Sequence, residues 1–201
     1  KYIRMVILQI RNVQYQYHDG TYALRGVSLD IQRGEFLAIL GPNGSGKTTL
    51  LKHLNGLLKP MKGEILLEQK SFKQYSSREI FQKVGIVFQD PNDQLFAPSV
   101  WEDVAFGPLN LGLSKDEIAY RVDDALSLVG MNACANKTVD ALSFGQKKRI
   151  CIAGVLAMKP EILVLDEPTC GLDPVGVTSL MTLLKELNGK HGITIIMATN
   201  T

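Results

Sequence analysis

The chain has 201 residues, of which 45% are hydrophobic and 21% are charged, and its formal net charge is +2. These values are typical of a globular protein of one or two domains, and so small a positive charge argues against a surface built to bind nucleic acid. No apolar run approaches the length of a membrane span, and the first residues do not have the pattern of a signal peptide.

A strand-rich segment comes first along the chain. Residues 7–17 alternate apolar and polar side chains, as an antiparallel strand with one face in water does. A turn at residues 18–20 and a second predicted strand at residues 27–31 follow. The sequence therefore predicts an N-terminal antiparallel β region.

A glycine-rich loop then separates a predicted strand at residues 35–40 from a helix that starts at Thr48. The loop has the form G-x-x-x-x-G-K-S/T and consists of Gly41, Pro42, Asn43, Gly44, Ser45, Gly46, Lys47 and Thr48. Glycines allow several backbone N–H groups to point at one anion, and a helix N-terminus adds its positive end, so this context predicts a phosphate-binding loop. We expect Lys47 to bind the β- and γ-phosphates of a nucleoside triphosphate, the Thr48 hydroxyl to bind Mg²⁺, and Thr49 to add a contact to the nucleotide. The alternative is a plain glycine turn with a solvated lysine.

Strands and helices alternate in the rest of the chain. The predicted strands are residues 63–68, 83–88, 161–167 and 193–198, and the predicted helical segments are residues 100–110, 114–130, 143–158 and 173–192. Buried apolar strands separated by helices are typical of an α/β fold whose mostly parallel sheet carries helices on both faces. The mostly helical stretch from residue 91 to about residue 136 is expected to form a subdomain inserted in that core.

Two acidic residues end the predicted strand at residues 161–167. Ligands of parallel sheets lie at the carboxyl ends of the strands, so we expect Asp166 beside the phosphate-binding loop, where it would hold Mg²⁺ through water. Glu167 follows directly and points differently, which suits a general base that polarises the attacking water. An acidic surface turn is the alternative.

Further motifs resemble those of ATP-binding-cassette (ABC) ATPases. Leu142-Ser143-Phe144-Gly145-Gln146 is similar to the signature motif of that family, usually Leu-Ser-Gly-Gly-Gln. Gln89 stands at the position of the family's Q-loop glutamine, Gly171-Leu172-Asp173 at that of its D-loop, and Tyr17 at that of an aromatic residue that stacks on adenine. The resemblance covers essentially the whole chain.

The resemblance implies a P-loop NTPase core that binds ATP and Mg²⁺ and hydrolyses the ATP. Two copies would face each other head to tail, with each ATP between the phosphate-binding loop of one copy and Ser143, Gly145, Gln146 and Asp173 of the other. Gln89 would sense the γ-phosphate and Mg²⁺ and relay their presence to a membrane partner. The implied catalytic residues are Lys47, Gln89 and Glu167, and the implied metal ligands are Thr48, Gln89 and Asp166.

The resemblance also implies a division of the chain. Residues 1–201 would form a single ABC nucleotide-binding domain, with residues 1–90 and 145–201 as a RecA-like core with its β region and residues 91–144 as a helical subdomain that carries the signature. Because the chain stops directly after an apolar strand, we expect further natural sequence on the C-terminal side.

A finer resemblance points to the energy-coupling-factor class of importers. Residues 142–149, with Phe144 in place of the first signature glycine, and residues 88–96 are most similar to the ATPase subunit of cobalt and nickel importers, and next to those of vitamin importers. This implies a peripheral protein at the cytoplasmic face of the cell membrane. Its partners would be a second ABC ATPase subunit, identical or different, a transmembrane coupling protein that docks on the apolar segment at residues 95–111, and a substrate-binding membrane protein, with no nucleic acid.

One position departs from the family pattern. The family carries a switch histidine after the last strand, and here Asn200 stands in its place. An asparagine can donate a hydrogen bond to a phosphate but cannot take up a proton. Either turnover is impaired, or the last residues differ from the natural sequence, which we favour.

Two other functions remain open from the sequence. One is a soluble ABC ATPase that acts on nucleic acid or ribosomes, and the other is a nucleotide-binding scaffold without turnover. Residues 89–142 hold a compact helical segment without the long heptad pattern of chromosome-organising members, and residues 147–149 are expected to be the solvated basic face of a helix.

Overall fold

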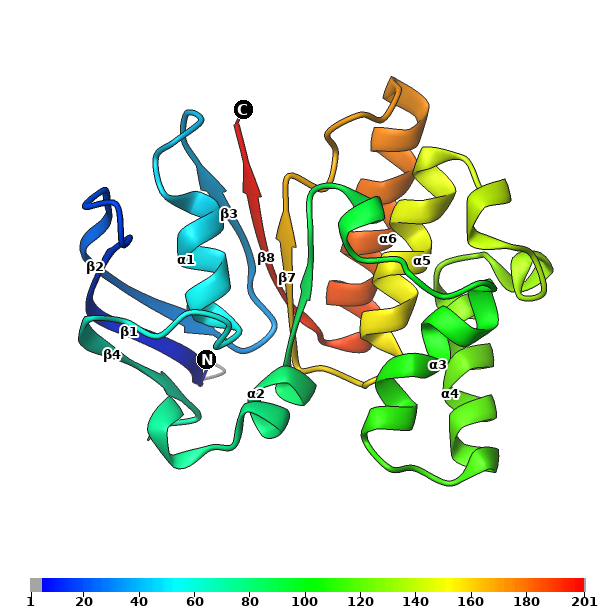
Figure 1. Cartoon of the computed structure of the whole chain (residues 1–201), viewed down its shortest axis with the longest axis horizontal. Coiled ribbons are helices and arrows are strands. Elements are labelled where there is room, and N and C mark those ends of the chain that lie inside the picture. Colours follow the sequence, from blue (N-terminus) through cyan, green and yellow to red (C-terminus); the bar gives the residue numbers. More distant parts are fainter. Residues whose placement is uncertain (1–4, 201) are drawn as a thin grey trace.

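Two four-stranded sheets organise the chain, and the computed structural model describes residues 5–200 (Figure 1). The antiparallel sheet has the order β2-β1-β4-β5 and consists of β1 (Val6–Gln16), β2 (Tyr22–Gln32), β4 (Lys62–Leu67) and β5 (Lys70–Ser71). The parallel sheet has the order β3-β8-β7-β6 and consists of β3 (Phe36–Leu40), β6 (Val84–Val87), β7 (Ile162–Asp166) and β8 (Thr194–Thr199). The expectation of further sequence beyond Thr201 falls outside the described residues.

Helices cover both faces of the parallel sheet, as the sequence predicts. They are α1 (Lys47–Leu54), α2 (Ser77–Lys83), α3 (Val100–Asn110), α4 (Lys115–Leu128), α5 (Phe144–Leu156) and α6 (Pro174–His191). Short 3₁₀ turns lie at Phe72–Gln74, Pro91–Asp93, Asn132–Cys134 and Val139–Ala141. Helix α1 lies between the two sheets, whereas α5 and α6 lie on the other side of the parallel sheet, with α3 and α4 outside them (Figure 1).

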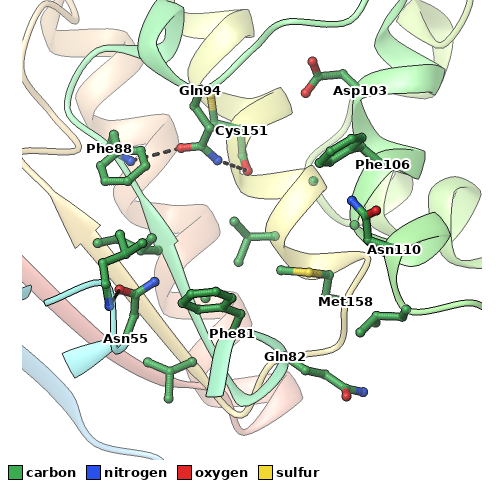
Figure 2. Close-up of a pocket in the computed structure, with 18 of the residues that line it drawn as sticks. Asn55, Phe81, Gln82, Phe88, Gln94, Asp103, Phe106, Asn110, Cys151 and Met158 are labelled. Atoms are coloured by element: carbon green, nitrogen blue, oxygen red, sulfur yellow. Dashed lines mark hydrogen bonds between the residues drawn. The ribbon is translucent and has the colours of Figure 1, made fainter. Parts of the chain in front are cut away.

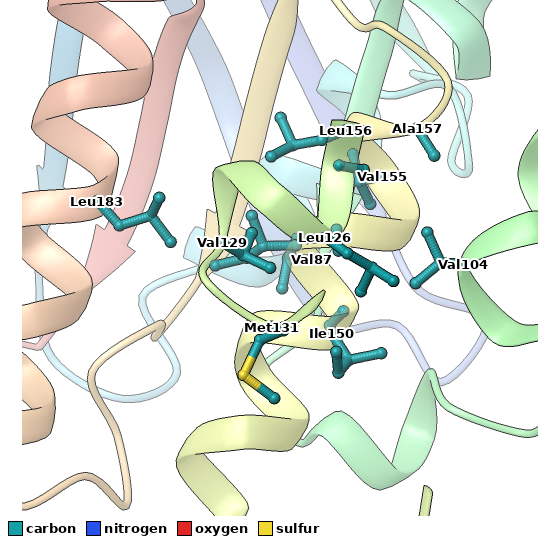
Figure 3. Close-up of a cluster of buried hydrophobic side chains, with 14 of the residues drawn as sticks. Val87, Val104, Leu126, Val129, Met131, Ile150, Val155, Leu156, Ala157 and Leu183 are labelled. Carbon is teal, nitrogen blue, oxygen red and sulfur yellow. The ribbon is translucent and has the colours of Figure 1, made fainter. Parts of the chain in front are cut away.

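The pleat of β7 explains why the molecule has two apolar layers. All five residues of this strand are buried, and successive side chains point to opposite faces. Ile162 and Val164 join the cluster that contains α1 and the antiparallel sheet. Leu163 and Leu165 join the cluster formed with α3 to α6, part of which Figure 3 shows.

The helical segment shares this second cluster with the parallel sheet. Val104 of α3 and Leu126 of α4 are buried in the same cluster as Ile150 of α5 and Val87 of β6 (Figure 3). The helical segment therefore packs directly on the core, and its boundary at residues 91–144 stays a prediction. Among residues 5–200, no helix combines the length and the apolar character needed to cross a membrane.

Helix α2 and strand β5 are the elements that the sequence analysis missed. Ser76 and Glu79 form a complete capping box at the start of α2, because each side chain accepts a hydrogen bond from the backbone N–H of the other residue. This Ser-x-x-Glu spacing is visible in the sequence and predicts the helix start. Strand β2 is also longer than the predicted residues 27–31.

Candidate nucleotide-binding site

The glycine-rich loop follows β3 and leads into α1, as the sequence predicts. Gly46 occupies the N-cap position with φ of 92°, and a Cβ there would lie 2.5 Å from the carbonyl oxygen of Ala23. Among residues 5–200, no side chain caps α1, and the first turn of this helix contains no acidic residue. The free N–H groups at this helix end therefore suit a bound anion, so the loop fits a phosphate group.

Lys47 brings a buried positive charge into this loop. Its side chain is 8% exposed, and its ammonium donates to the carbonyl oxygens of Gly41 at 2.7 Å and Pro42 at 3.1 Å. The same ammonium donates to Oδ1 of Asn200 at 2.8 Å and lies 3.6 Å from Oε1 of Glu167. Lys47 thus connects the loop with the ends of β7 and β8.

Thr48 and Asp166 meet directly beside Lys47. The Thr48 hydroxyl donates to Oδ2 of Asp166 at 2.6 Å. Asp166 is 4% exposed, and its Oδ1 is buried without a hydrogen-bond partner among the described residues. A buried carboxylate oxygen rarely stays unpaired, and a hydroxyl with one carboxylate is a donor set that Mg²⁺ uses together with water and substrate phosphates. The two residues therefore fit a magnesium ion.

Glu167 lies in a backbone conformation that is unfavourable for a residue with a side chain. Its φ is 45°, in the left-handed region. Its N–H donates to the carbonyl oxygen of Ala198 at 3.0 Å, and its Oε2 accepts from the N–H of Asn200 at 3.3 Å. Such conformations concentrate at functional sites, where the surrounding structure holds them. The carboxylate lies close enough to Lys47 to act on a group bound in the loop.

Tyr17 lies at the edge of the same site. Its hydroxyl is 2.8 Å from Oγ1 of Thr49, and its ring packs edge-on against Tyr15 at 5.1 Å. The Tyr15 ring in turn packs against His53 at 4.7 Å, and His53 is completely buried in α1. Burial lowers the pKa of His53 because it disfavours the charged imidazolium.

The signature residues lie apart from the phosphate-binding loop of their own chain. Ser143 and Gln146 cap the start of α5 reciprocally, and Asp173 caps α6 by accepting from the N–H of Gly176 at 2.7 Å. Gly145 packs near Leu172, because a Cβ on it would lie 3.4 Å from that side chain. Helices α5 and α6 lie across the parallel sheet from α1, so these residues do not join the cluster around Lys47 (Figure 1).

Gln89 follows β6 near the same edge of the parallel sheet. Its side-chain amide donates to the Cys170 thiol at 3.5 Å. Within residues 5–200 it makes no hydrogen bond to Thr48 or Asp166. Its assignment as a metal ligand therefore stays a prediction.

The expectation that residues 147–149 form a solvated basic face is wrong for Lys148. This residue is 3% exposed, and its ammonium donates to the carbonyl oxygens of Gln89, Glu167 and Pro168. Burial lowers the pKa of Lys148. The helical spacing from Lys148 to the buried Ile152 and Val155 could have revealed that it lies on the inner face of α5.

The chain is a P-loop nucleoside triphosphatase. This class is defined by its phosphate-binding loop with a buried lysine and by the acidic end of a parallel strand beside that loop. The family described as ABC transporter matches residues 24–170. The energy-coupling factor transporter ATP-binding protein EcfA of Methanocaldococcus jannaschii is 53% identical over 198 residues, which cover 98% of this chain and 71% of EcfA.

Solved structures of ABC proteins are also similar to this chain. The protein cbiO1 of Clostridium perfringens, part of the ABC transporter complex cbiONQ, has a TM-score of 0.89 and 51% identity over 98% of this chain and 79% of its own. A dimeric ATP-binding cassette in a post-hydrolysis state with ADP and Pi has a TM-score of 0.84 and 33% identity over 97% of this chain and 88% of its own. The chain therefore belongs to the ABC transporter family, as an ATPase of the energy-coupling factor type.

Proposed function

We propose that this chain is the ATP-hydrolysing subunit of an energy-coupling-factor importer for cobalt or nickel ions or for a vitamin. The observation that carries the proposal is the contact between the Thr48 hydroxyl and Asp166 at 2.6 Å, beside an unpaired Asp166 oxygen. It joins the phosphate-binding loop to the acidic end of β7, which is what hydrolysis of a metal-bound triphosphate requires.

In this proposal each residue of the cluster has a separate role. The N–H groups at the start of α1 and the Lys47 ammonium bind the phosphates of ATP. Thr48 and Asp166 would hold Mg²⁺, which would neutralise charge on the phosphates. Glu167 takes a proton from the attacking water, since its carboxylate lies 3.6 Å from the lysine that binds the phosphates. Tyr17 stacks on the adenine.

The separation of the signature from the loop supports a composite site. Ser143, Gly145, Gln146 and Asp173 would contact the ATP that is held by the loop of a second subunit. The uncapped N–H groups of one chain and the signature of the other would then enclose the triphosphate from both sides. A dimeric structural relative in a post-hydrolysis state supports this arrangement.

A groove beside β6 suits a membrane partner. It has a volume of about 500 Å³, and its lining includes Phe96 and Val155. Figure 2 shows four more apolar lining residues, Phe81, Phe88, Phe106 and Met158. Phe96 is 64% exposed and Phe106 is 47% exposed, and their rings pack edge-to-face at 4.6 Å. An exposed apolar surface of this kind is typical of a docking site, and here the proposed occupant is the transmembrane coupling protein.

Hydrogen bonds of Gln94 connect the lining of the groove with the segment that starts at Gln89. Oε1 of Gln94 accepts from the N–H of Phe88 at 3.0 Å, and its side-chain amide donates to the carbonyl oxygen of Cys151 at 3.3 Å (Figure 2). A docked partner would therefore contact the segment that follows Gln89. The proposed location is the cytoplasmic face of the cell membrane.

Co-purification with the transmembrane coupling protein, combined with ATP hydrolysis by the resulting complex, tests the proposal. The expected result is a stable detergent-solubilised complex whose ATPase rate responds to the transported substrate, with cobalt ions, nickel ions and vitamins as separate arms. Salt-sensitive binding to DNA with no membrane complex would instead favour a soluble ATPase. ATP binding without turnover in the complex would contradict the proposal.

A further inference from the structure

The buried Lys148 ammonium donates to backbone carbonyl oxygens, and it forms no salt bridge with a carboxylate of residues 5–200. Its ammonium has three N–H donors, and three backbone carbonyl oxygens accept from it. The distances are 3.2 Å to Gln89, 3.3 Å to Glu167 and 2.9 Å to Pro168. A buried ammonium is costly unless its donors are satisfied, so loss of this side chain would leave these carbonyl groups without their charged partner.

One of these carbonyl groups belongs to the strained Glu167. With φ of 45°, its peptide needs support from neighbouring elements. The Glu167 N–H donates to β8 at Ala198, and its carbonyl oxygen accepts from the N–H of Cys170 at 3.1 Å and from Lys148 at 3.3 Å. The contact from Lys148 comes from α5, and it fixes the peptide from which the Glu167 carboxylate extends.

Phe144 helps to hold the lysine in place. It lies one helical turn before Lys148, and its ring centroid is 5.3 Å from the ammonium, which is within the range of a cation–π contact. The same ring packs closely on Gly171, where a Cβ would lie 2.7 Å from Cε1 of Phe144. The position of Lys148 is thus set by α5, which begins at the signature, and by the turn that follows Glu167.

We infer that Lys148 is a positioning residue for Glu167. Its ammonium holds the Glu167 peptide in the left-handed conformation and so aims the carboxylate at the attacking water. The same ammonium also donates to the carbonyl group of Gln89. A movement of the segment that follows Gln89 and lines the docking groove would therefore change the position of Lys148 and, through it, the orientation of Glu167. The inference rests on the proposed function, in which Glu167 is the general base.

Steady-state ATP hydrolysis by the full chain tests the inference with Lys148→Met, which removes the donors but keeps a long side chain. We expect kcat to fall about 10-fold or more while KM for ATP changes less than about 3-fold, because the lysine acts on the chemical step rather than on binding. Lys148→Arg, which can still donate to carbonyl groups, should recover part of kcat. A role in folding alone would lower the thermal stability without this separation of kcat from KM.

The matched control is Lys147→Met, on the neighbouring residue, whose ammonium donates to the side chain of Asn92 at 3.1 Å. It should keep the wild-type rate. In a Glu167→Gln background, Lys148→Met should lower the remaining rate less than about 2-fold, because the two residues act as one unit.

The possible outcomes separate this inference from the proposed function. A folded Lys148→Met chain with wild-type kcat, or an equal loss in both backgrounds, would overturn the positioning role while Glu167 kept its own. If Lys148→Met does not fold, a wild-type kcat in Lys148→Gln overturns the inference, and a lowered kcat with unchanged KM supports it. A Glu167→Gln chain with the wild-type rate would instead overturn the base assignment itself.

Discussion

The ammonium of Lys47 lies among four oxygen atoms, three of which accept hydrogen bonds from it. Lys47→Ala removes the charge that is proposed to bind the phosphates, so we expect ATP affinity in titration calorimetry to fall about 10- to 100-fold. Lys190→Ala, at a lysine that is 71% exposed at the end of α6, is the control and should bind ATP like the wild type. Unchanged affinity in Lys47→Ala would contradict the phosphate-binding role.

His53 makes stability depend on pH. Its Nδ1 donates to the carbonyl oxygen of Thr49, since a carbonyl group can only accept, and its buried Nε2 has no partner among the described residues. Burial lowers its pKa in the folded state, so below about pH 6.5 the unfolded chain takes up a proton that the folded chain does not. Above this pH, protonation of His53 should not reduce the free energy of unfolding. Below it, the free energy of unfolding should fall by at most about 1.4 kcal/mol per pH unit.

Urea unfolding at pH 7.5 and 5.5 measures this dependence. His53→Gln should lose less stability between the two pH values than the wild type does. His191→Gln, at an exposed histidine at the end of α6, is the control and should behave like the wild type. An identical pH dependence in the wild type and His53→Gln would mean that other groups carry the effect.

Sequence motifs predict the residues of the candidate site better than they predict how its backbone is held. The order of strand, glycine loop and helix places Lys47 and Thr48, and the parallel-strand rule places Asp166 beside them. No local sequence pattern predicts the φ of 45° at Glu167, because two of the groups that hold its peptide, the Ala198 carbonyl group and the Lys148 ammonium, come from distant parts of the chain. Asn200 likewise contacts Lys47 only because β8 ends beside the loop.

Among the elements, the turn before α3 carries Phe96, which lies on the proposed docking surface. Phe96→Asp places a charge in the groove at a side chain that is 64% exposed, so it should abolish co-purification with the coupling membrane protein and leave basal ATP hydrolysis in place. Tyr120→Asp, at an aromatic residue of α4 that is 58% exposed, is the control and should keep both properties. If Phe96→Asp also keeps both, the partner docks elsewhere; if it loses both, the side chain supports the fold.

In the segment that contains Phe96, the helix could be predicted but the burial of its individual apolar residues could not. The amphipathic pattern at residues 100–110 predicts a helix, and the structure confirms α3 there. The sequence does not say which of these apolar residues face the core, because that depends on how α4 and α5 pack against α3. Val100 and Val104 are completely buried, whereas Phe96 and Phe106 stay exposed.

At the scale of the whole molecule, the distance between the signature and the loop leads to a prediction about assembly. Lys47→Ala disables the loop side of a composite site, and Ser143→Arg disables the signature side by placing a bulky charge at the start of α5. Each variant alone should be inactive. A mixture should recover activity, because a heterodimer contains one composite site with both wild-type components.

Concentration dependence accompanies this mixing experiment. Specific ATPase activity of the wild type should rise with protein concentration, as it does when the active form is a dimer. The Lys190→Ala variant mixed with Ser143→Arg provides a control for the effect of mixing itself. Failure of the two inactive variants to complement each other would contradict a site shared between chains.

The fold as a whole could be predicted because its periodic signals are strong. Completely buried strands such as β7 indicate a parallel sheet with both faces covered, and the structure confirms this. The layering of α1 between the two sheets could not be predicted, because the antiparallel strands carry no signal for which face of the parallel sheet they cover. The contacts of the signature residues could not be derived from one chain either, because their proposed partners lie in a second copy.

In the proposed function, Lys47, Thr48, Asp166 and Glu167 form one ATP-hydrolysing site with Glu167 as its base. The most direct test is the rate of ATP hydrolysis by Glu167→Gln, measured together with its ATP affinity and its ATP-dependent dimer formation. We expect ATP affinity near that of the wild type, a rate lower by about 10²-fold or more, and a dimer that persists with ATP bound. Hydrolysis at the wild-type rate would mean that Glu167 is not the base.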